Sequence, residues 1–182
     1  MGARGDHSRC TGRQTSAPNH WIPTGTDYML PDNAFLALWN DISSHREPEY
    51  DQWHTQEHVP ERVSVQGFRG ARRYVNRGRV HHRYFTLYEV DSLGVFTSAE
   101  YRDLLENPTP WSASMRPDFS NFLRATCSVV TSRSTGIGAA IACLCVPKSA
   151  ADKHLHLALV TAMSLPGVRQ SSLASLDRRS RS

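Results

Sequence analysis

Two histidines stand four residues apart in the run His54-Thr55-Gln56-Glu57-His58. On a helix this spacing places both imidazoles on one face. A neutral imidazole titrates near physiological pH, so a histidine that faces an apolar pocket can take a proton from a substrate and return it. The pair therefore indicates proton transfer, while simple packing of both rings inside the protein stays open.

The same spacing would also suit two ligands of one metal ion, with Glu57 beside them. The order of residues differs from the His-Glu-x-x-His pattern of zinc peptidases, because the glutamate directly precedes the second histidine. The sequence offers no third ligand that can be named. We therefore predict a site without a metal and without any other cofactor.

Five further residues are candidates around the histidines. Asp41 and Tyr50 are predicted to orient or hydrogen-bond the reacting groups, and Trp53, Tyr74 and Arg72 to contact the substrate. Arg72 belongs to a basic region that could receive a carboxylate or a phosphate. Strand alternation would send Arg72 and its neighbour Arg73 to opposite faces, so a solvated strand surface is the simpler interpretation of this region.

The elements that must position these residues follow the order β, α, β, β, α, β over 34–134. Apolar runs and β-branched residues predict strands at 34–39, 68–74, 84–90 and 125–131. Helical spacing after a starting proline predicts a helix at 48–65, which bends or restarts at Pro60. Shorter helical stretches are predicted at 98–107 and 109–115. This is an α+β, ferredoxin-like module whose antiparallel sheet carries both helices on one face. The bare second face predicts a homodimer through the sheet.

Several motifs in this region resemble those of EthD-like proteins of the dimeric α/β-barrel superfamily. They are the run Glu57-His58-Val59-Pro60-Glu61-Arg62 after a Tyr/Trp-rich helix, then Gln66-Gly67-Phe68, Ala71-Arg72-Arg73-Tyr74, Tyr84-Phe85-Thr86-Leu87-Tyr88-Glu89 and Asn107-Pro108-Thr109-Pro110-Trp111. Gln66 stands where such sequences usually have proline.

The resemblance implies a cofactor-independent small-molecule enzyme similar to isomerases, cyclases, decarboxylases or monooxygenases. It makes His58 the first candidate for proton transfer, ahead of His54, because the Glu-His dipeptide belongs to the matching motif. The expected ligand is a small apolar or aromatic molecule in a cavity between sheet and helices. A non-catalytic ligand-binding or assembly module remains the alternative.

Outside this module the chain has a different character. Residues 1–33 are predicted to be a disordered leader, and residues 135–182 an incomplete second copy of the module with a disordered basic tail. In this second copy, residues 137–146 are expected to form a strand that buries Cys143 and Cys145, followed by a helix and a second strand. The segment 129–138 resembles a nucleotide-binding glycine loop, but Ser132 replaces its first glycine and too few residues follow for that fold.

Composition excludes several classes of function. The formal charge of +4 comes largely from arginines in the two tails, so no nucleic-acid partner is predicted. No run approaches the roughly 18 apolar residues of a membrane span, and no signal peptide or disulfide framework is evident, which predicts a cytoplasmic protein.

Overall fold

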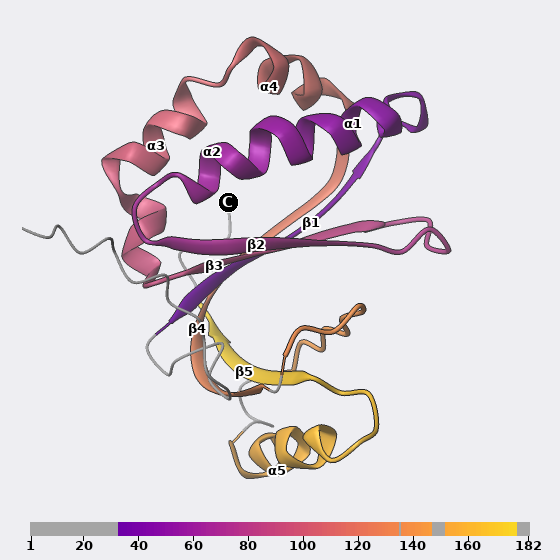
Figure 1. Cartoon of the computed structure of the whole chain (residues 1–182), viewed down its shortest axis with the longest axis vertical. Helices are drawn as coiled ribbons and strands as arrows, with labels where there is room; N and C mark the ends of the chain where they lie inside the picture. The colour runs from indigo at the N-terminus through magenta and orange to yellow at the C-terminus, as the bar shows by residue number, and fades with distance from the viewer. Residues whose placement is uncertain (1–32, 135, 147–151, 178–182) are drawn as a thin grey trace, which may run out of the picture.

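The computed structural model describes residues 33–134, 136–146 and 152–177. The predicted leader, except Asn33, and the basic tail after 177 lie outside these residues. The described part is an α+β structure with a five-stranded antiparallel sheet in the order β2-β3-β1-β4-β5 (Figure 1). The strands are β1 (Ala34–Ile42), β2 (Phe68–Val75), β3 (Tyr84–Val90), β4 (Phe119–Ser134) and β5 (Gln170–Leu176).

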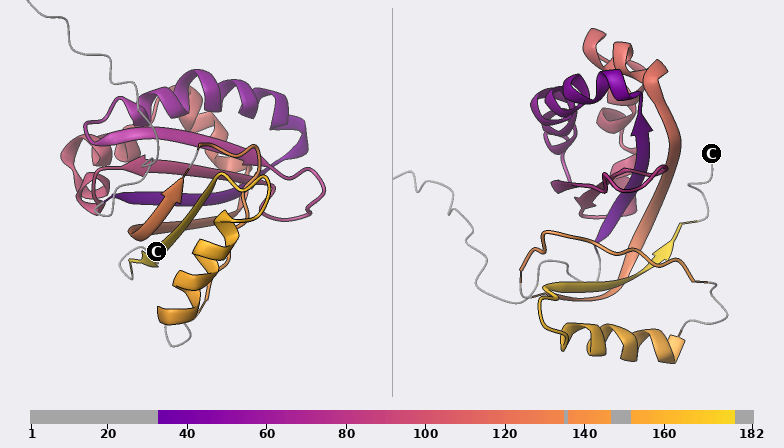
Figure 2. Two further views of the ribbon diagram at one scale, coloured as in Figure 1. Left: turned by 60° about the horizontal axis from the view of Figure 1, so that its bottom comes forward. Right: turned by 90° about the vertical axis from the view of Figure 1, so that its right-hand side faces the viewer.

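The helices between β1 and the start of β4 lie along one face of β1, β2, β3 and the first part of β4, whereas the helix before β5 packs against β5 (Figures 1 and 2). The first is a continuous helical stretch with three parts, and the others follow β3 or precede β5. They are α1 (Glu47–Trp53), the π-helical turn η2 (His54–His58), α2 (Val59–Val63), α3 (Ala99–Glu106), α4 (Pro110–Met115) and α5 (Asp152–Met163), with short 3₁₀ turns η1 (Ser44–Arg46), η3 (Leu93–Thr97) and η4 (Arg116–Asp118).

The predicted order β, α, β, β, α, β is found between β1 and β4, and it is compatible with a ferredoxin-like arrangement. Side chains alternate across the sheet. On β1, Leu36 packs with the helix-side core, whereas Ala37 belongs to a cluster on the other face with Phe85 and Leu87. Gly67 lies in the turn between α2 and β2 with φ of +92°, a conformation that glycine adopts without strain.

Strand boundaries differ most from prediction at β4, which is 16 residues long. Its first half pairs with β1 and its second half with β5. The prediction covered only residues 125–131, because the flanking residues Ser120 to Leu123 and Ser132 to Ser134 are polar or exposed and gave no strand pattern.

The prediction for the second copy was right only in part. α5 and β5 are present, but residues 137–146 form no regular secondary structure, and Cys143 and Cys145 are exposed rather than buried in a strand. Residues 137–146 pair with no strand of the described sheet. An apolar composition alone is therefore not sufficient to form a strand. Within the described residues, no helix has the length and apolar character needed to cross a membrane.

Candidate functional site

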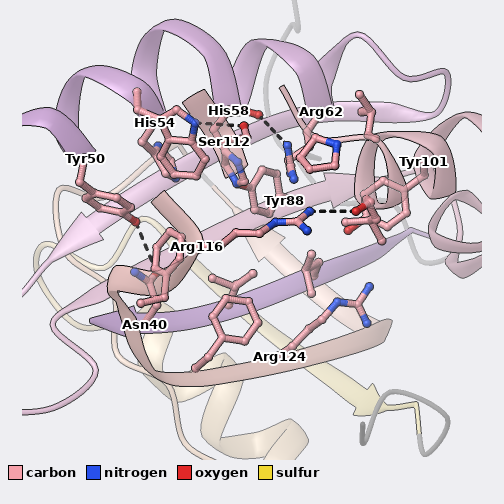
Figure 3. A pocket seen from close by; sticks show the side chains of 18 of the residues that line it. Asn40, Tyr50, His54, His58, Arg62, Tyr88, Tyr101, Ser112, Arg116 and Arg124 are labelled. Atoms are coloured by element: carbon pink, nitrogen blue, oxygen red, sulfur yellow. Dashed lines mark hydrogen bonds between the residues drawn. The ribbon is translucent and has the colours of Figure 1, made fainter. Parts of the chain in front are cut away.

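A cavity of about 500 Å³ lies between the helices and the sheet (Figure 3). Leu36, Leu38 and Asn40 of β1 form its sheet side, and His54 and His58 border it from the helix above. Most of the remaining wall is apolar or aromatic, from Tyr50, Trp53, Tyr88, Phe96, Tyr101, Leu104, Leu105, Pro108, Phe119 and Phe122. Such a chamber suits a small molecule with an apolar body.

The two histidines begin and end the π-helical turn η2, where the N–H of Val59 bonds to the carbonyl oxygen of His54. Pro60 follows directly, and a proline ring inside a helix crowds the carbonyl of the fourth residue before it. A wider turn ahead of Pro60 relieves that crowding. Single π turns of this kind occur frequently at functional sites.

The ring of His58 lies beside the aromatic rings of Trp53 and Tyr88. The ring packs against Trp53 with centroids 4.2 Å apart, and its Nδ1 is buried with no hydrogen-bond partner among the residues that the structure describes. Burial lowers the pKa of His58 well below its ordinary value, and the charges of Arg62 and of His54 add to the effect. At neutral pH the imidazole is therefore uncharged, and its Nδ1 can take part in a hydrogen bond with a ligand.

His54 lies beside it, with the two rings 5.3 Å apart, but its environment differs. Only 4% of His54 is exposed, and its Nε2 is 3.3 Å from the hydroxyl of Thr86. Burial, helped by Arg73 and Arg62, lowers its pKa from 6.5 to about 3. His54 thus has a hydrogen-bond partner in the core, which suits a structural role better than proton transfer.

Two tyrosines contribute hydroxyls to the cavity wall. The hydroxyl of Tyr50 donates to Asn40 Oδ1 at 3.3 Å, and burial raises its pKa to about 12. Tyr88 lies nearer to His58, with ring centroids 6.4 Å apart, and its hydroxyl is buried with no hydrogen-bond partner in the described ranges. Burial raises the pKa of Tyr88 as well, so this hydroxyl keeps its proton.

Trp53 is fixed by a network that starts at Glu57. The indole N–H of Trp53 donates to Glu57 Oε1 and to Ser112 Oγ, each at 3.1 Å. The hydroxyls of Ser112 and Thr109 donate to the same glutamate oxygen at 3.0 and 2.6 Å. Glu57 therefore connects the first helix to α4 and holds Trp53 as a rigid wall of the cavity. No group of three His, Cys, Asp or Glu side chains in the described segments could hold a metal ion.

Three predicted site residues lie away from the cavity. Asp41 accepts from the N–H groups of Arg83 and His82 at 2.7 and 2.9 Å and from Asn121 at 2.7 Å. Burial alone would raise the pKa of this carboxyl, but these three hydrogen bonds outweigh it and lower the pKa. Asp41 lies near the end of β1, outside the cavity lining. Its hydrogen bonds stabilise the loop between β2 and β3.

Tyr74 and Arg72 are on the face of the sheet opposite the helices. Tyr74 packs in the cluster around Phe85, and Arg72 pairs with Glu89 and reaches Gln170 at 3.5 Å. Arg73 points the other way and bonds to Asp51 at 2.9 Å, so alternation divides the arginines as the sequence predicted. Neither Tyr74 nor Arg72 is brought together with the histidines.

Sequence reasoning missed other residues of the cavity, namely Tyr88, Arg62, Arg116 and Arg124. Tyr88 had a usable signal in strand alternation, because Tyr88 and Thr86 are two residues apart on β3 and therefore share a face of the sheet that Phe85 and Leu87 do not. Arg62 stands four residues after His58, one helical turn further on. Arg116 and Arg124 had none, because a 3₁₀ turn and the exposed start of β4 position them.

The comparisons with known proteins add no assignment to this site. No family model matches the chain, and neither a curated protein nor a solved structure matches it. The function must therefore be argued from the geometry of the cavity.

Proposed function

We propose that the chain is a small-molecule enzyme of the cofactor-independent type, in which His58 transfers a proton inside the apolar cavity. One observation carries the proposal: the uncharged ring of His58 lies 6.4 Å from the ring of Tyr88 between centroids, and neither His58 Nδ1 nor the Tyr88 hydroxyl has a hydrogen-bond partner among the described residues. Unsatisfied buried polar groups are costly, and in native proteins they mark places where a ligand or water supplies the missing bond.

The pair supplies both halves of a proton-transfer step. A ring nitrogen of His58 takes a proton from a carbon next to a substrate carbonyl, and the electrons of that C–H bond move to the carbonyl oxygen. The Tyr88 hydroxyl donates a hydrogen bond to the oxygen as it becomes negative. The imidazolium then returns the proton to the same carbon or to a conjugated one, which completes an exchange or an isomerisation without any cofactor. Isomerase reactions proceed through such a step.

The test is solvent deuterium uptake by a panel of small ketones and lactones, followed by NMR. We expect the wild type to exchange at least one of them, and His58→Asn to lose about a hundredfold or more of that rate. His45→Asn is the matched control, because His45 lies outside the cavity lining and its side chain is 73% exposed. Equal rates in the wild type and in His58→Asn would remove the proposal. Saturable binding without exchange by any variant would favour the ligand-binding module instead.

We further infer that residues 34–134 form a ferredoxin-like βαββαβ module of the EthD-like, dimeric α/β-barrel type. The strand order, the helices on one face and the place of His58 within the matching motif support this inference.

A homodimer through the far face of the sheet belongs to the same proposal. That face is apolar around Phe35, Trp39 and Leu123, and Leu123 is 49% exposed. The charges of Arg72 and Glu89 on the same face neutralise each other in an ion pair. A second copy presents the same surface and can bury it. Sedimentation velocity should give twice the chain mass for the wild type, and a mass nearer that of one chain for Trp39→Glu. A wild-type monomer at the highest soluble concentration would contradict the pairing.

A further inference from the structure

The charged groups of the cavity are all of one sign. Arg62, Arg116 and Arg124 border it together with the two histidines, and the lining that the structure describes contains no aspartate or glutamate. Figure 3 shows Arg62 on the helix side, Arg124 on β4 and the Arg116 side chain between them. An apolar chamber with three guanidinium groups has a positive potential that favours an anionic ligand.

The arginines differ in how far they are already engaged. Arg62 donates to the carbonyl oxygen of His58 at 3.3 Å and lies 3.5 Å from the carboxylate of Glu61. Arg116 donates to the carbonyl oxygen of Leu105 at 2.8 Å, and the Arg124 guanidinium lies 5.8 Å from the ring centre of Phe96. Neither Arg116 nor Arg124 forms an ion pair with a residue of the described ranges.

Both of these arginines belong to the same end of the cavity. Arg116 is anchored at the last turn of α3 through Leu105, and Arg124 lies over Phe96, whose ring is 5.6 Å from that of Tyr101 on α3. Phe96, Leu104 and Phe122 line the chamber there. Two guanidinium forks beside apolar walls match a planar carboxylate on a hydrocarbon body, since guanidinium and carboxylate form parallel hydrogen bonds.

We propose that the cavity takes a small carboxylic acid in its ionised form, with the carboxylate between Arg116 and Arg124 and the apolar body against Phe96 and Phe122. Tyr88 is 1% exposed, and its buried hydroxyl has no hydrogen-bond partner in the described segments, which points independently to a ligand with a hydrogen-bond acceptor in this cavity. The substrate class rests on the proposed function, in which the acid also carries the carbonyl that His58 and Tyr88 act on. Binding of the carboxylate does not depend on turnover.

Calorimetry with matched pairs of probes tests this assignment. Naphthoate and cyclohexanecarboxylate are titrated beside their neutral amides, and inorganic phosphate is the third probe. We expect each carboxylate to bind the wild type more tightly than its amide, and Arg116→Gln and Arg124→Gln each to weaken only the carboxylates, by about tenfold to a hundredfold. Arg102→Gln is the control, because Arg102 is an exposed arginine on α3 outside the cavity lining.

The outcomes separate this inference from the proposed function. Equal affinity for carboxylate and amide in the wild type overturns it, and so does a carboxylate preference that both arginine variants keep. Phosphate that binds as tightly as the carboxylates overturns the substrate class. If the carboxylates bind through the arginines but no keto acid exchanges deuterium, the inference stands and the proton-transfer proposal fails. Arg116 is exposed, so its variant is expected to fold even if Arg124→Gln does not.

Discussion

The two faces of the sheet differ in how their buried polar groups are satisfied. On the helix-covered face, Asn40 Nδ2, His58 Nδ1 and the Tyr88 hydroxyl lie in the wall of one cavity without a hydrogen-bond partner among the described residues. On the far face, Arg72 is paired with Glu89, and the rings of Trp39 and Phe85 pack 4.7 Å apart. Three such groups therefore lie where a small molecule fits, whereas the apolar far face, in which Arg72 and Glu89 neutralise each other, is suited to a flat protein surface.

The faces should also contribute differently to stability, and β1 offers neighbouring residues to test this. Leu36 is 2% exposed in the helix-side core, whereas Phe35 on the other face is only half-buried. We expect Leu36→Ala to lower the free energy of unfolding by about 2 to 5 kcal/mol, as for buried leucines in general. Phe35→Ala should cost less in a dilute sample, because less of its surface is removed from water in one chain. Chemical unfolding followed by circular dichroism measures both.

Protein concentration sharpens this comparison. If a second copy covers the far face, the cost of Phe35→Ala should grow as the concentration rises, because association stabilises only the paired wild type. The cost of Leu36→Ala at low concentration and its cost at high concentration should be alike. A Phe35→Ala variant that is as destabilised as Leu36→Ala when dilute would show that the two faces are equally part of the monomer core.

The helix-covered face was the more predictable of the two from sequence. The spacing of His54 and His58 placed both on one helix face, and the rings do meet. Pattern reasoning could not tell which histidine had a partner, because Thr86, which contacts His54, is 32 residues away in sequence and its position depends on strand register. Asp41 was misplaced for a similar reason: its partners are distant in sequence, with Arg83 in the loop before β3 and Asn121 near the start of β4.

Strand parity was the neglected signal. Tyr74 and Arg72 were grouped with the site by residue type, yet β2 pairs with β3 in a register that sets Arg72 opposite Leu87 and Tyr74 opposite Phe85, both on the far face. Tyr88 and Thr86 have the other parity and belong to the cavity side. Leu36 is buried on the helix side and pairs with Tyr88 across β1 and β3. Had the faces of the strands been assigned from Leu36, Tyr88 would have been placed at the cavity, and Tyr74 and Arg72 on the far face. The absence of a strand at 137–146 could not be foreseen, because composition does not specify pairing.

The buried histidines make the helix-covered face sensitive to pH. His54 has a pKa of about 3 in the folded protein against an ordinary value of 6.5, so below about pH 6.5 the unfolded chain binds the proton more strongly than the folded one. Stability is therefore full above that pH and is lost as the pH falls towards 3. For this one residue the loss between neutral pH and pH 5 amounts to about 2 kcal/mol. His58 acts in the same direction, because its pKa is also lowered.

The substitution His54→Gln isolates this effect. Glutamine reaches a similar length and can still bond to Thr86, but it does not titrate, so the variant should lose about 2 kcal/mol less than the wild type between pH 7 and pH 5. Urea unfolding at both pH values measures the difference. His45→Gln, which changes an exposed histidine outside the cavity lining, is the matched control. An unchanged pH dependence in His54→Gln would mean that His54 has the same pKa in the folded and the unfolded chain, so that burial does not lower it. That result would make the cavity a wetter site than its apolar lining indicates and would remove the reason for treating His54 and His58 as uncharged at neutral pH.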